Sequence, residues 1–248
     1  MAEERPDLSF RNSDGTVWKN RAGHGFVNPF MEEVWEYNVE VAKQAAMMGF
    51  KDIQFDYVRF PEGFELRDDE LEYSRGEYTG SDLDNVQQRV EAVTDFVAYA
   101  RKELEPFDVD VSVDIFGYSA TVPEAPGIGQ NFSRISENVD VISSMIYPSH
   151  WGPGSLGLAK PDLEPYNVVA KYMEHENRVL GELGEDAPVS RPWIQDFTAS
   201  YLGSGNYIRY GAHEVSEQIR ALNEYGVNEF LLWNAGNTYS GSAQYSFD

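Results

Sequence analysis

Two aspartates stand near the ends of two β-prone segments. Asp56 lies in DIQFDYVRF (52–60) and Asp114 in VDVSVDIFG (109–117). Apolar residues alternate with polar ones in both segments, so each aspartate belongs to the polar face of its strand. Two carboxylates that face one cavity can divide the work of catalysis, one ionised as nucleophile and one protonated as acid. Each aspartate could instead cap the following loop or pair with an arginine, and the spacing alone leaves these roles open.

The elements that carry these aspartates alternate between strand and helix. Strands are also predicted at residues 141–149, 188–197 and 229–236, and helices at 31–50, 82–107, 132–140, 165–183 and 212–226. The helix at 82–107 is expected to begin at Ser81 as its N-cap. Such alternation indicates parallel strands joined by right-handed crossovers.

A doubly wound sheet and a barrel would both satisfy this alternation. No G-x-G-x-x-G follows a predicted strand and no P-loop is present, which disfavours a nucleotide-binding sheet. Strands of a doubly wound sheet tend to be apolar throughout, whereas a barrel strand has helices outside and a lumen inside. We therefore predict an α/β fold of the (β/α)8 TIM-barrel type, in a single domain over residues 1–248.

The predicted barrel is incomplete. Five strands are recognisable, all after residue 50, so we expect that about three of the usual eight β/α units are missing, unless the fold is smaller and unusual. The segment at 5–26 could cover part of the gap, but it is too polar and turn-rich to replace three strands. An open sheet edge would favour self-association.

Composition excludes several classes of protein. The formal net charge of −23 argues against nucleic-acid binding, because phosphates need Lys and Arg partners. The absence of cysteine excludes disulfides and Cys-based zinc sites. The four histidines lack metal-binding spacing, and the acid-rich 67–72 lacks the calcium-loop pattern, so we interpret it as a solvated loop. We expect neither metal nor cofactor.

The sequence leaves the compartment open. No apolar run approaches the length of a transmembrane helix, so we expect no membrane insertion. The first residues, MAEERPDLSF, lack the apolar core of a signal peptide. A sequence that begins after its leader would be compatible with secretion or display at the cell surface.

Several motifs together resemble a known family. IQFDYVRFP, VSVDIFG, ISSMIYPSHW, RPWIQDF and FLLWNAGNTY, in this order, resemble the glycoside hydrolase family catalogued as domain of unknown function 4015, one of the TIM-barrel glycosyl hydrolases. The upstream GHGFVNPF is similar to its Trp-Val-Asp-Pro-Tyr segment, with Phe26 and Asn28 where Trp and Asp are usual. The resemblance implies a carbohydrate substrate and hydrolysis of O-glycosyl bonds, names no sugar, and supports the inference of missing strands.

The resemblance also implies roles for the aspartates. Asp56 would close barrel strand four, the position of the nucleophile in several related glycosidase groups, and Asp114 would be the general acid/base of a retaining mechanism. Asp196 competes for the second role, although strict alternation turns Gln195 inward instead. A chitinase-type mechanism is disfavoured, because Val58 stands where its motif D-x-x-D-x-D-x-E needs a glutamate.

Six other residues are candidates for substrate binding: Arg59, Tyr147, His150, Trp151, Gln195 and Asn234. Aromatic, imidazole and hydroxyl groups at a barrel mouth suit sugar faces and sugar hydroxyls, or pack within loops. Arg59 could contact substrate, orient Asp56 or pair with Glu62, and Asn234 could bind substrate or form a turn before Gly236. The alternatives to an enzyme are an inactive carbohydrate-binding or scaffolding barrel and a fragment of a larger hydrolase.

Overall fold

The chain folds as two compact units, seen in a computed structural model that describes residues 1–246. Unit 1 comprises Met1–Val113 and Val122–Asp140. Unit 2 comprises Asp114–Thr121 and the chain from Val141 onward. The expectation of a single domain stays a prediction, and each unit is described by itself.

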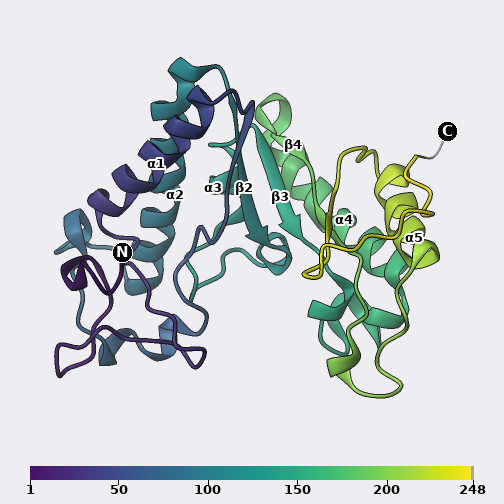
Figure 1. Ribbon diagram of the computed structural model, residues 1–248, viewed down its shortest axis with the longest axis horizontal. Helices are drawn as coiled ribbons and strands as arrows, with labels where there is room; N and C mark the ends of the chain where they lie inside the picture. The colour runs from purple at the N-terminus through teal and green to yellow at the C-terminus, as the bar shows by residue number, and fades with distance from the viewer. Residues whose placement is uncertain (247–248) are drawn as a thin grey trace. The chain divides into compact units, whose positions relative to one another are not determined.

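Unit 1 contains two parallel strands and three helices. The elements are α1 (Glu32–Met47), β1 (Asp52–Phe55), α2 (Asn85–Leu104), the first four residues of β2 (Asp110–Phe116), and the short α3 (Phe132–Ser136). Asp52 lies opposite Asp110 and Phe55 opposite Val113. Helices α1 and α2 lie side by side (Figure 1). The predicted strand–helix order is thus confirmed for this part of the chain.

The core of unit 1 joins both helices to both strands. Ala42 of α1, Ile53 of β1, Leu104 of α2 and Val111 of β2 form one buried cluster. The N-cap of α2 is Asp84, whose Oδ1 accepts a hydrogen bond from the Gln87 amide at 2.8 Å. The prediction of Ser81 as N-cap is therefore wrong by three residues.

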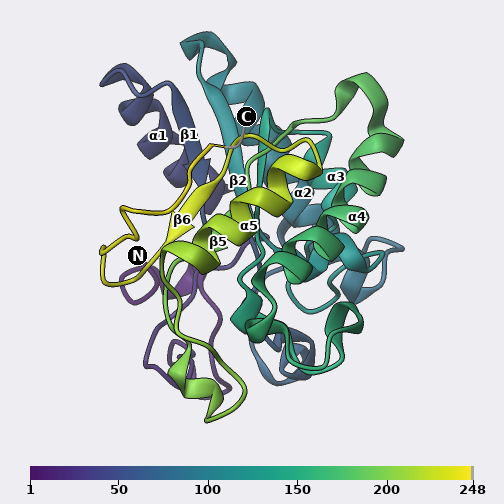
Figure 2. The same cartoon turned by 90° about the vertical axis from the view of Figure 1, so that its right-hand side faces the viewer.

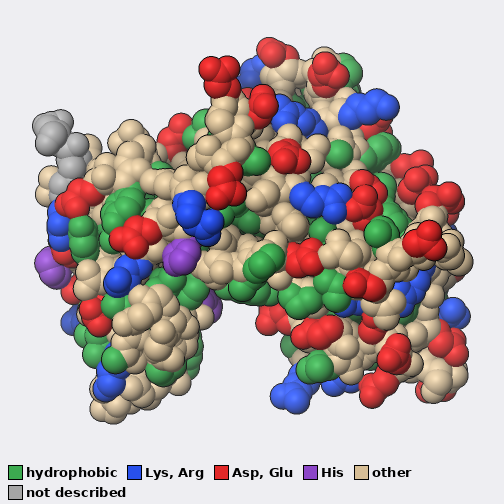
Figure 3. All heavy atoms as spheres, turned by 180° about the vertical axis from the view of Figure 1, so that it is seen from behind, with side chains coloured by type: hydrophobic (Ala, Val, Ile, Leu, Met, Phe, Trp, Pro, Cys, Tyr) green, Lys and Arg blue, Asp and Glu red, His purple; other side chains and the backbone are tan. Residues whose placement is uncertain are grey.

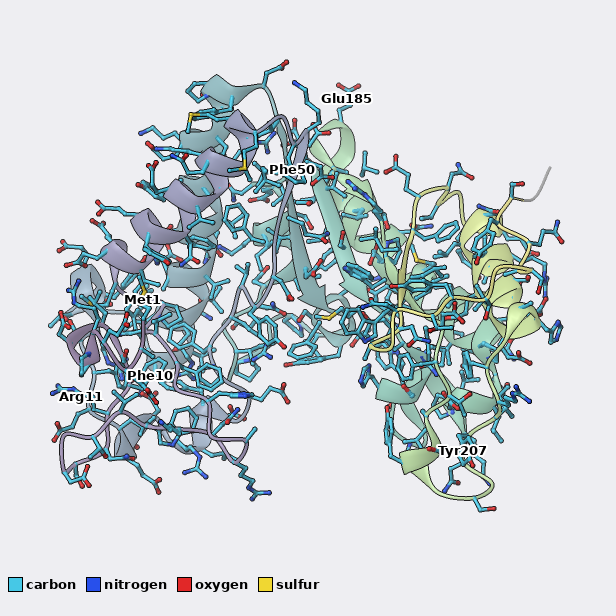
Figure 4. The ribbon with its side chains drawn as sticks, in the orientation of Figure 1. Met1, Phe10, Arg11, Phe50, Glu185 and Tyr207 are labelled. Atoms are coloured by element: carbon cyan, nitrogen blue, oxygen red, sulfur yellow. The ribbon has the colours of Figure 1, made fainter. Side chains whose placement is uncertain are left out.

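Residues 5–31 and 57–80 of unit 1 form what we call the aromatic lobe. It contains short 3-10 turns and isolated bridges such as Ser9–Val27, and aromatic rings form its core. The ring centroids of Phe10 and Phe64 lie 4.7 Å apart, and those of Phe30 and Phe60 lie 4.9 Å apart. Figure 4 shows the labelled Phe10 among these rings. The N-terminal segment is polar in sequence, yet Phe10 anchors it.

One acid of the 67–72 segment is buried, so the prediction of a solvated loop is wrong for Asp68. Its carboxylate lies 2.7 Å from Arg89 of α2 and 3.1 Å from Arg75. Asp69 and Glu70 are exposed as expected. A buried carboxylate is tolerated when cations surround it. The sequence near Asp68 could not predict this burial, because Arg89 lies in a separate helix, α2.

Unit 2 continues the parallel pattern. Its elements are β3 (Val141–Met145), α4 (Pro165–Leu183), β4 (Val189–Ser190), β5 (Trp193–Gln195), α5 (Ala212–Glu224) and β6 (Leu231–Trp233). Strand β3 pairs with β4 and with β5, and β5 pairs with β6, all in parallel. The strand predicted at 188–197 forms two short strands, because Pro192 between them has no N–H to donate. Helices α4 and α5 lie side by side (Figure 2).

The last three residues of β2 belong to unit 2 and lead into a close approach to β3. A Cβ atom at Gly117 would lie 2.5 Å from the Met145 carbonyl oxygen. Only glycine therefore allows the chain to leave β2 along this path.

Three further observations concern the whole described chain. In the face drawn in Figure 3, acidic side chains are scattered among other residues, as expected of a solvated acidic surface. Within residues 1–246, no helix is both long and apolar enough to cross a membrane. The same residues contain no group of three or more His, Asp or Glu side chains placed to hold a metal ion.

Candidate active site

Asp56 lines a cavity of about 380 Å³ at the C-terminal end of β1, and all its lining residues belong to unit 1. Aromatic rings from four parts of the unit line this cavity: Phe26, Trp35, Phe55, Tyr57 and Phe96. Asp56 and Arg59 are the charged residues in its lining. A largely apolar pocket with a few converging polar groups is the usual form of a small-ligand site. We call it the Asp56 pocket.

A sharp turn places Asp56 at the pocket. Tyr57 has a φ of 55°, in the left-handed region that non-glycine residues seldom adopt. Its amide donates a hydrogen bond to Asp56 Oδ1 at 2.7 Å, and the Arg59 amide donates to the Tyr57 carbonyl at 2.8 Å. This turn ends the extended conformation, so the strand predicted to reach residue 60 stops at Phe55. Asp56 itself is exposed.

The Arg59 side chain packs against the turn at Tyr57. Its guanidinium donates to the Phe60 carbonyl at 3.2 Å and to Glu62 Oε1 at 3.3 Å. The guanidinium carbon also lies 5.1 Å from the centre of the Tyr57 ring. The Arg59 side chain is only 10% exposed, so these contacts hold it within the wall of the pocket. The expected pairing of Arg59 with Glu62 is therefore present, together with a contact to the Tyr57 ring.

Asp114 lies in unit 2 with a different environment. It is 7% exposed, and the indole N–H of Trp193 donates to its Oδ1 at 2.8 Å. The Trp193 ring meets Trp233 edge-on at 6.0 Å, and Trp233 is 43% exposed. The polar face of β2 therefore carries a carboxylate whose orientation an indole fixes. Trp193 thus both packs against Trp233 and acts as a hydrogen-bond donor.

Asp196 serves the segment that follows β6. Its Oδ1 accepts the Ser240 hydroxyl and its Oδ2 accepts the Ser240 amide, both at 2.7 Å. Asn234 donates to the carbonyls of Asp196 and Thr238, and its Oδ1 accepts the Gly236 amide at 2.8 Å. These are the bonds of a turn-forming asparagine, which was one of its two expected roles.

Gln195 is fully buried in a polar network. Its Oε1 accepts the Ser149 amide at 3.0 Å, and its Nε2 donates to Asp162 Oδ1 at 2.9 Å. Burial raises the pKa of Asp162, and the bonds from Gln195 and the Ile208 amide partly offset that rise. Gln195, the last residue of β5, therefore holds the segment between β3 and α4 at two points.

The aromatic candidates after β3 point in different directions. The Tyr147 ring lies 5.0 Å from His150 and 6.0 Å from Phe197. Tyr147 is buried and His150 is exposed. Trp151 packs instead against Tyr172 of α4, with centroids 5.9 Å apart. Tyr147 and His150 thus form one group, whereas Trp151 belongs to the contact with the helix.

The structure brings Asp56 and Arg59 together in unit 1, and Asp196 and Asn234 together in unit 2. Sequence reasoning missed Tyr57, Trp35 and Phe96 as pocket residues. Tyr57 stands directly between two candidates, which was a usable signal. Trp35 and Phe96 lie within amphipathic helices, where an aromatic residue is ordinarily assigned to the core.

Comparison with known proteins identifies a family over nearly the whole chain. The family model DUF4015, described as "Putative glycosyl hydrolase domain", matches residues 1–239. No curated protein matches the chain in sequence.

Several solved structures are similar in fold. The PgaB (BpsB) glycoside hydrolase domain from Bordetella bronchiseptica has 13% identity and a TM-score of 0.55, covering 88% of this chain and 64% of that one. The Bacillus megaterium spore cortex-lytic enzyme SleL has 13% identity and a TM-score of 0.53, covering 86% and 52%. Bee venom hyaluronidase, in complex with a hyaluronic acid tetramer, has 12% identity and a TM-score of 0.50, covering 89% and 75%.

At these identities the similarity shows the fold alone. The fold is α/β, with the parallel strands and helices of TIM-barrel glycosidases, as predicted. The described residues hold six strands, fewer than the eight of a full barrel. The chain spans 64% and 52% of the lengths of the PgaB domain and SleL.

Proposed function

The chain belongs to the family catalogued as domain of unknown function 4015, a glycosyl hydrolase domain family, and on this premise we propose that it hydrolyses O-glycosidic bonds. The observation that supports this most is the Asp56 pocket. It holds an exposed carboxylate among aromatic rings at the C-terminal end of a parallel strand. Barrel enzymes carry their catalytic groups at that end of their strands, and aromatic faces suit the C–H faces of sugars.

We assign Asp56 as the nucleophile of a retaining mechanism. Its carboxylate would attack the anomeric carbon while Asp114 gives a proton to the departing glycosidic oxygen. Asp114 would then take a proton from water, which attacks the same carbon and releases Asp56. The Tyr57 amide and the Trp193 indole each fix one of these carboxylates, which supports the assignment.

Release of reducing ends from soluble oligosaccharides tests the function. We expect Asp56→Asn to lower kcat at least ~10³-fold with nearly unchanged melting temperature, because an exposed carboxylate contributes little to packing. Asp69→Asn is the matched control, since Asp69 is an exposed aspartate in the same unit outside the pocket. A large loss of stability with retained turnover would make Asp56 a structural residue.

Azide rescue separates the two roles. Azide added to Asp56→Gly should occupy the place of the nucleophile and give a glycosyl azide of inverted configuration. Azide added to Asp114→Ala should react with the glycosyl-enzyme and give the retained configuration. Rescue of Asp196→Ala instead of Asp114→Ala would transfer the acid/base role to Asp196. Binding of oligosaccharides without cleavage by the wild-type chain would favour a carbohydrate-binding protein.

A further inference from the structure

The Tyr57 side chain is unusually placed for a large aromatic group. It is 71% exposed although it lines the Asp56 pocket, and its backbone lies in the left-handed region. A tyrosine gains nothing from that backbone conformation, and an exposed ring contributes little burial. Strained residues persist where the surrounding structure holds them, and they gather at ligand sites.

The contacts around Tyr57 hold the ring next to the candidate nucleophile. Its amide donates to Asp56 Oδ1 at 2.7 Å, so the backbone that orients the ring also orients the carboxylate. The Arg59 guanidinium lies 5.1 Å from the ring centre, as in a cation–π contact. Arg59 is in turn fixed by the Phe60 carbonyl and Glu62. The ring is therefore supported from within the protein and presented outward.

We propose that the Tyr57 ring is a stacking platform for one pyranose residue of the substrate, next to Asp56. The inference rests on the proposed function and narrows its substrate class. A sugar stacks on an aromatic ring through a face of C–H bonds, because the ring face carries partial negative charge. Gluco-configured pyranoses present such a face, since their hydroxyls are equatorial and their ring C–H bonds axial. Furanoses do not present it.

Strain makes the platform distinguishable from a packing residue. Tyr57→Gly removes the ring, keeps the amide that bonds Asp56, and relieves the left-handed backbone. A packing residue replaced by glycine would lower the melting temperature. A platform replaced by glycine should weaken substrate binding while the melting temperature stays equal or rises.

Calorimetric titration tests this in an Asp56→Asn background, so that no cleavage occurs during binding. The probes are cellohexaose and chitohexaose, with arabinohexaose as the furanose control. We expect Tyr57→Gly to raise Kd for the better-bound pyranose probe about tenfold, and Tyr57→Phe to change it less than about twofold. Tyr57→Asn, which also tolerates the left-handed backbone, should behave like the glycine variant. Tyr37→Ala, which removes an exposed tyrosine ring of unit 1 outside the pocket, should leave Kd unchanged.

With Asp56 restored, Tyr57→Gly should raise KM about tenfold with kcat within about twofold, since the amide bond to Asp56 remains. The proposal is overturned by an unchanged Kd, by a melting temperature several degrees lower, by equal affinity for arabinohexaose, or by no binding of either pyranose probe. Probe binding that depends on Tyr57, without cleavage by the wild-type chain, would support the platform and refute hydrolysis.

Discussion

The two units hold their buried carboxyl groups in opposite ways. In unit 1, Asp68 lies between two guanidinium groups, Arg89 at 2.7 Å and Arg75 at 3.1 Å. In unit 2, Glu176 of α4 is fully buried and accepts hydrogen bonds from the hydroxyls of Ser144, Tyr172 and Ser190. One carboxyl is balanced by charge and the other by neutral donors.

The difference has consequences for protonation. Burial raises the pKa of Glu176, and the three hydroxyl bonds only partly oppose that rise. Burial in unit 2 therefore favours the neutral form of Glu176 more than water does, whereas two cations balance the charge of Asp68 in unit 1. The two units should respond differently to removal of a partner and to pH.

The largest effect is expected from Arg89→Met. The substitution leaves the buried Asp68 carboxylate without its closest cation, which should lower the free energy of unfolding by about 3–5 kcal/mol. Urea denaturation measures it. Asp68→Asn combined with Arg89→Met should cost less than Arg89→Met alone, because no charge is then left buried. Arg178→Met, at an exposed pair with Glu182, is the control and should change stability by less than about 0.5 kcal/mol. A similarly small loss of stability for Arg89→Met would contradict the view that Arg89 stabilises the buried Asp68 carboxylate.

A smaller, pH-dependent effect is expected from Glu176→Gln. The pKa of Glu176 in the folded chain is raised above its ordinary value of 4.5, so its stabilising contribution is complete below that value. It is lost as the pH rises through the raised pKa, because only the unfolded chain ionises readily. Glutamine cannot ionise and should keep the hydroxyl bonds. The variant should melt about 2–4 °C above wild type at pH 8 and level with it at pH 4.

Thermal melts from pH 4 to pH 8 measure this difference. Glu182→Gln removes an exposed carboxyl from the same helix and should show no such divergence. A constant difference between Glu176→Gln and wild type at every pH would mean that folding does not raise the pKa of Glu176.

Sequence patterns predict an element correctly when residues at its own ends mark where it begins and stops. The helix at 165–183 is confirmed at both ends, because Pro165 begins it and Gly184, with φ 64°, ends it. The strand predicted at 52–60 ends at Phe55, because Tyr57 adopts a left-handed backbone conformation. No sequence pattern around Tyr57 predicts that conformation. Asp56 could be placed at a strand end, whereas Trp35 and Phe96 reach its pocket from separate helices.

A partner distant in the chain explains why the sequence did not predict the burial of Asp68. The burial of Asp68 depends on Arg89, twenty-one residues further along the chain and in α2. Self-association through an open sheet edge stays a prediction, which light scattering coupled to size-exclusion chromatography can test. A monomer at all concentrations would contradict it.

The smallest effect is expected at Asp196, whose carboxylate is held by neutral donors, as in Glu176. Ser240→Ala removes the hydroxyl bond to Oδ1 and keeps the amide bond to Oδ2, so it should cost about 0.5 kcal/mol of unfolding free energy. Turnover should be nearly unchanged if Asp114 is the acid/base, because Asp196 then only holds the segment after β6. Ser246→Ala, at an exposed serine further along that segment, is the control for the substitution itself. A drop in kcat of a hundredfold or more with a shifted pH profile would instead show that the Ser240 bond tunes a catalytic Asp196.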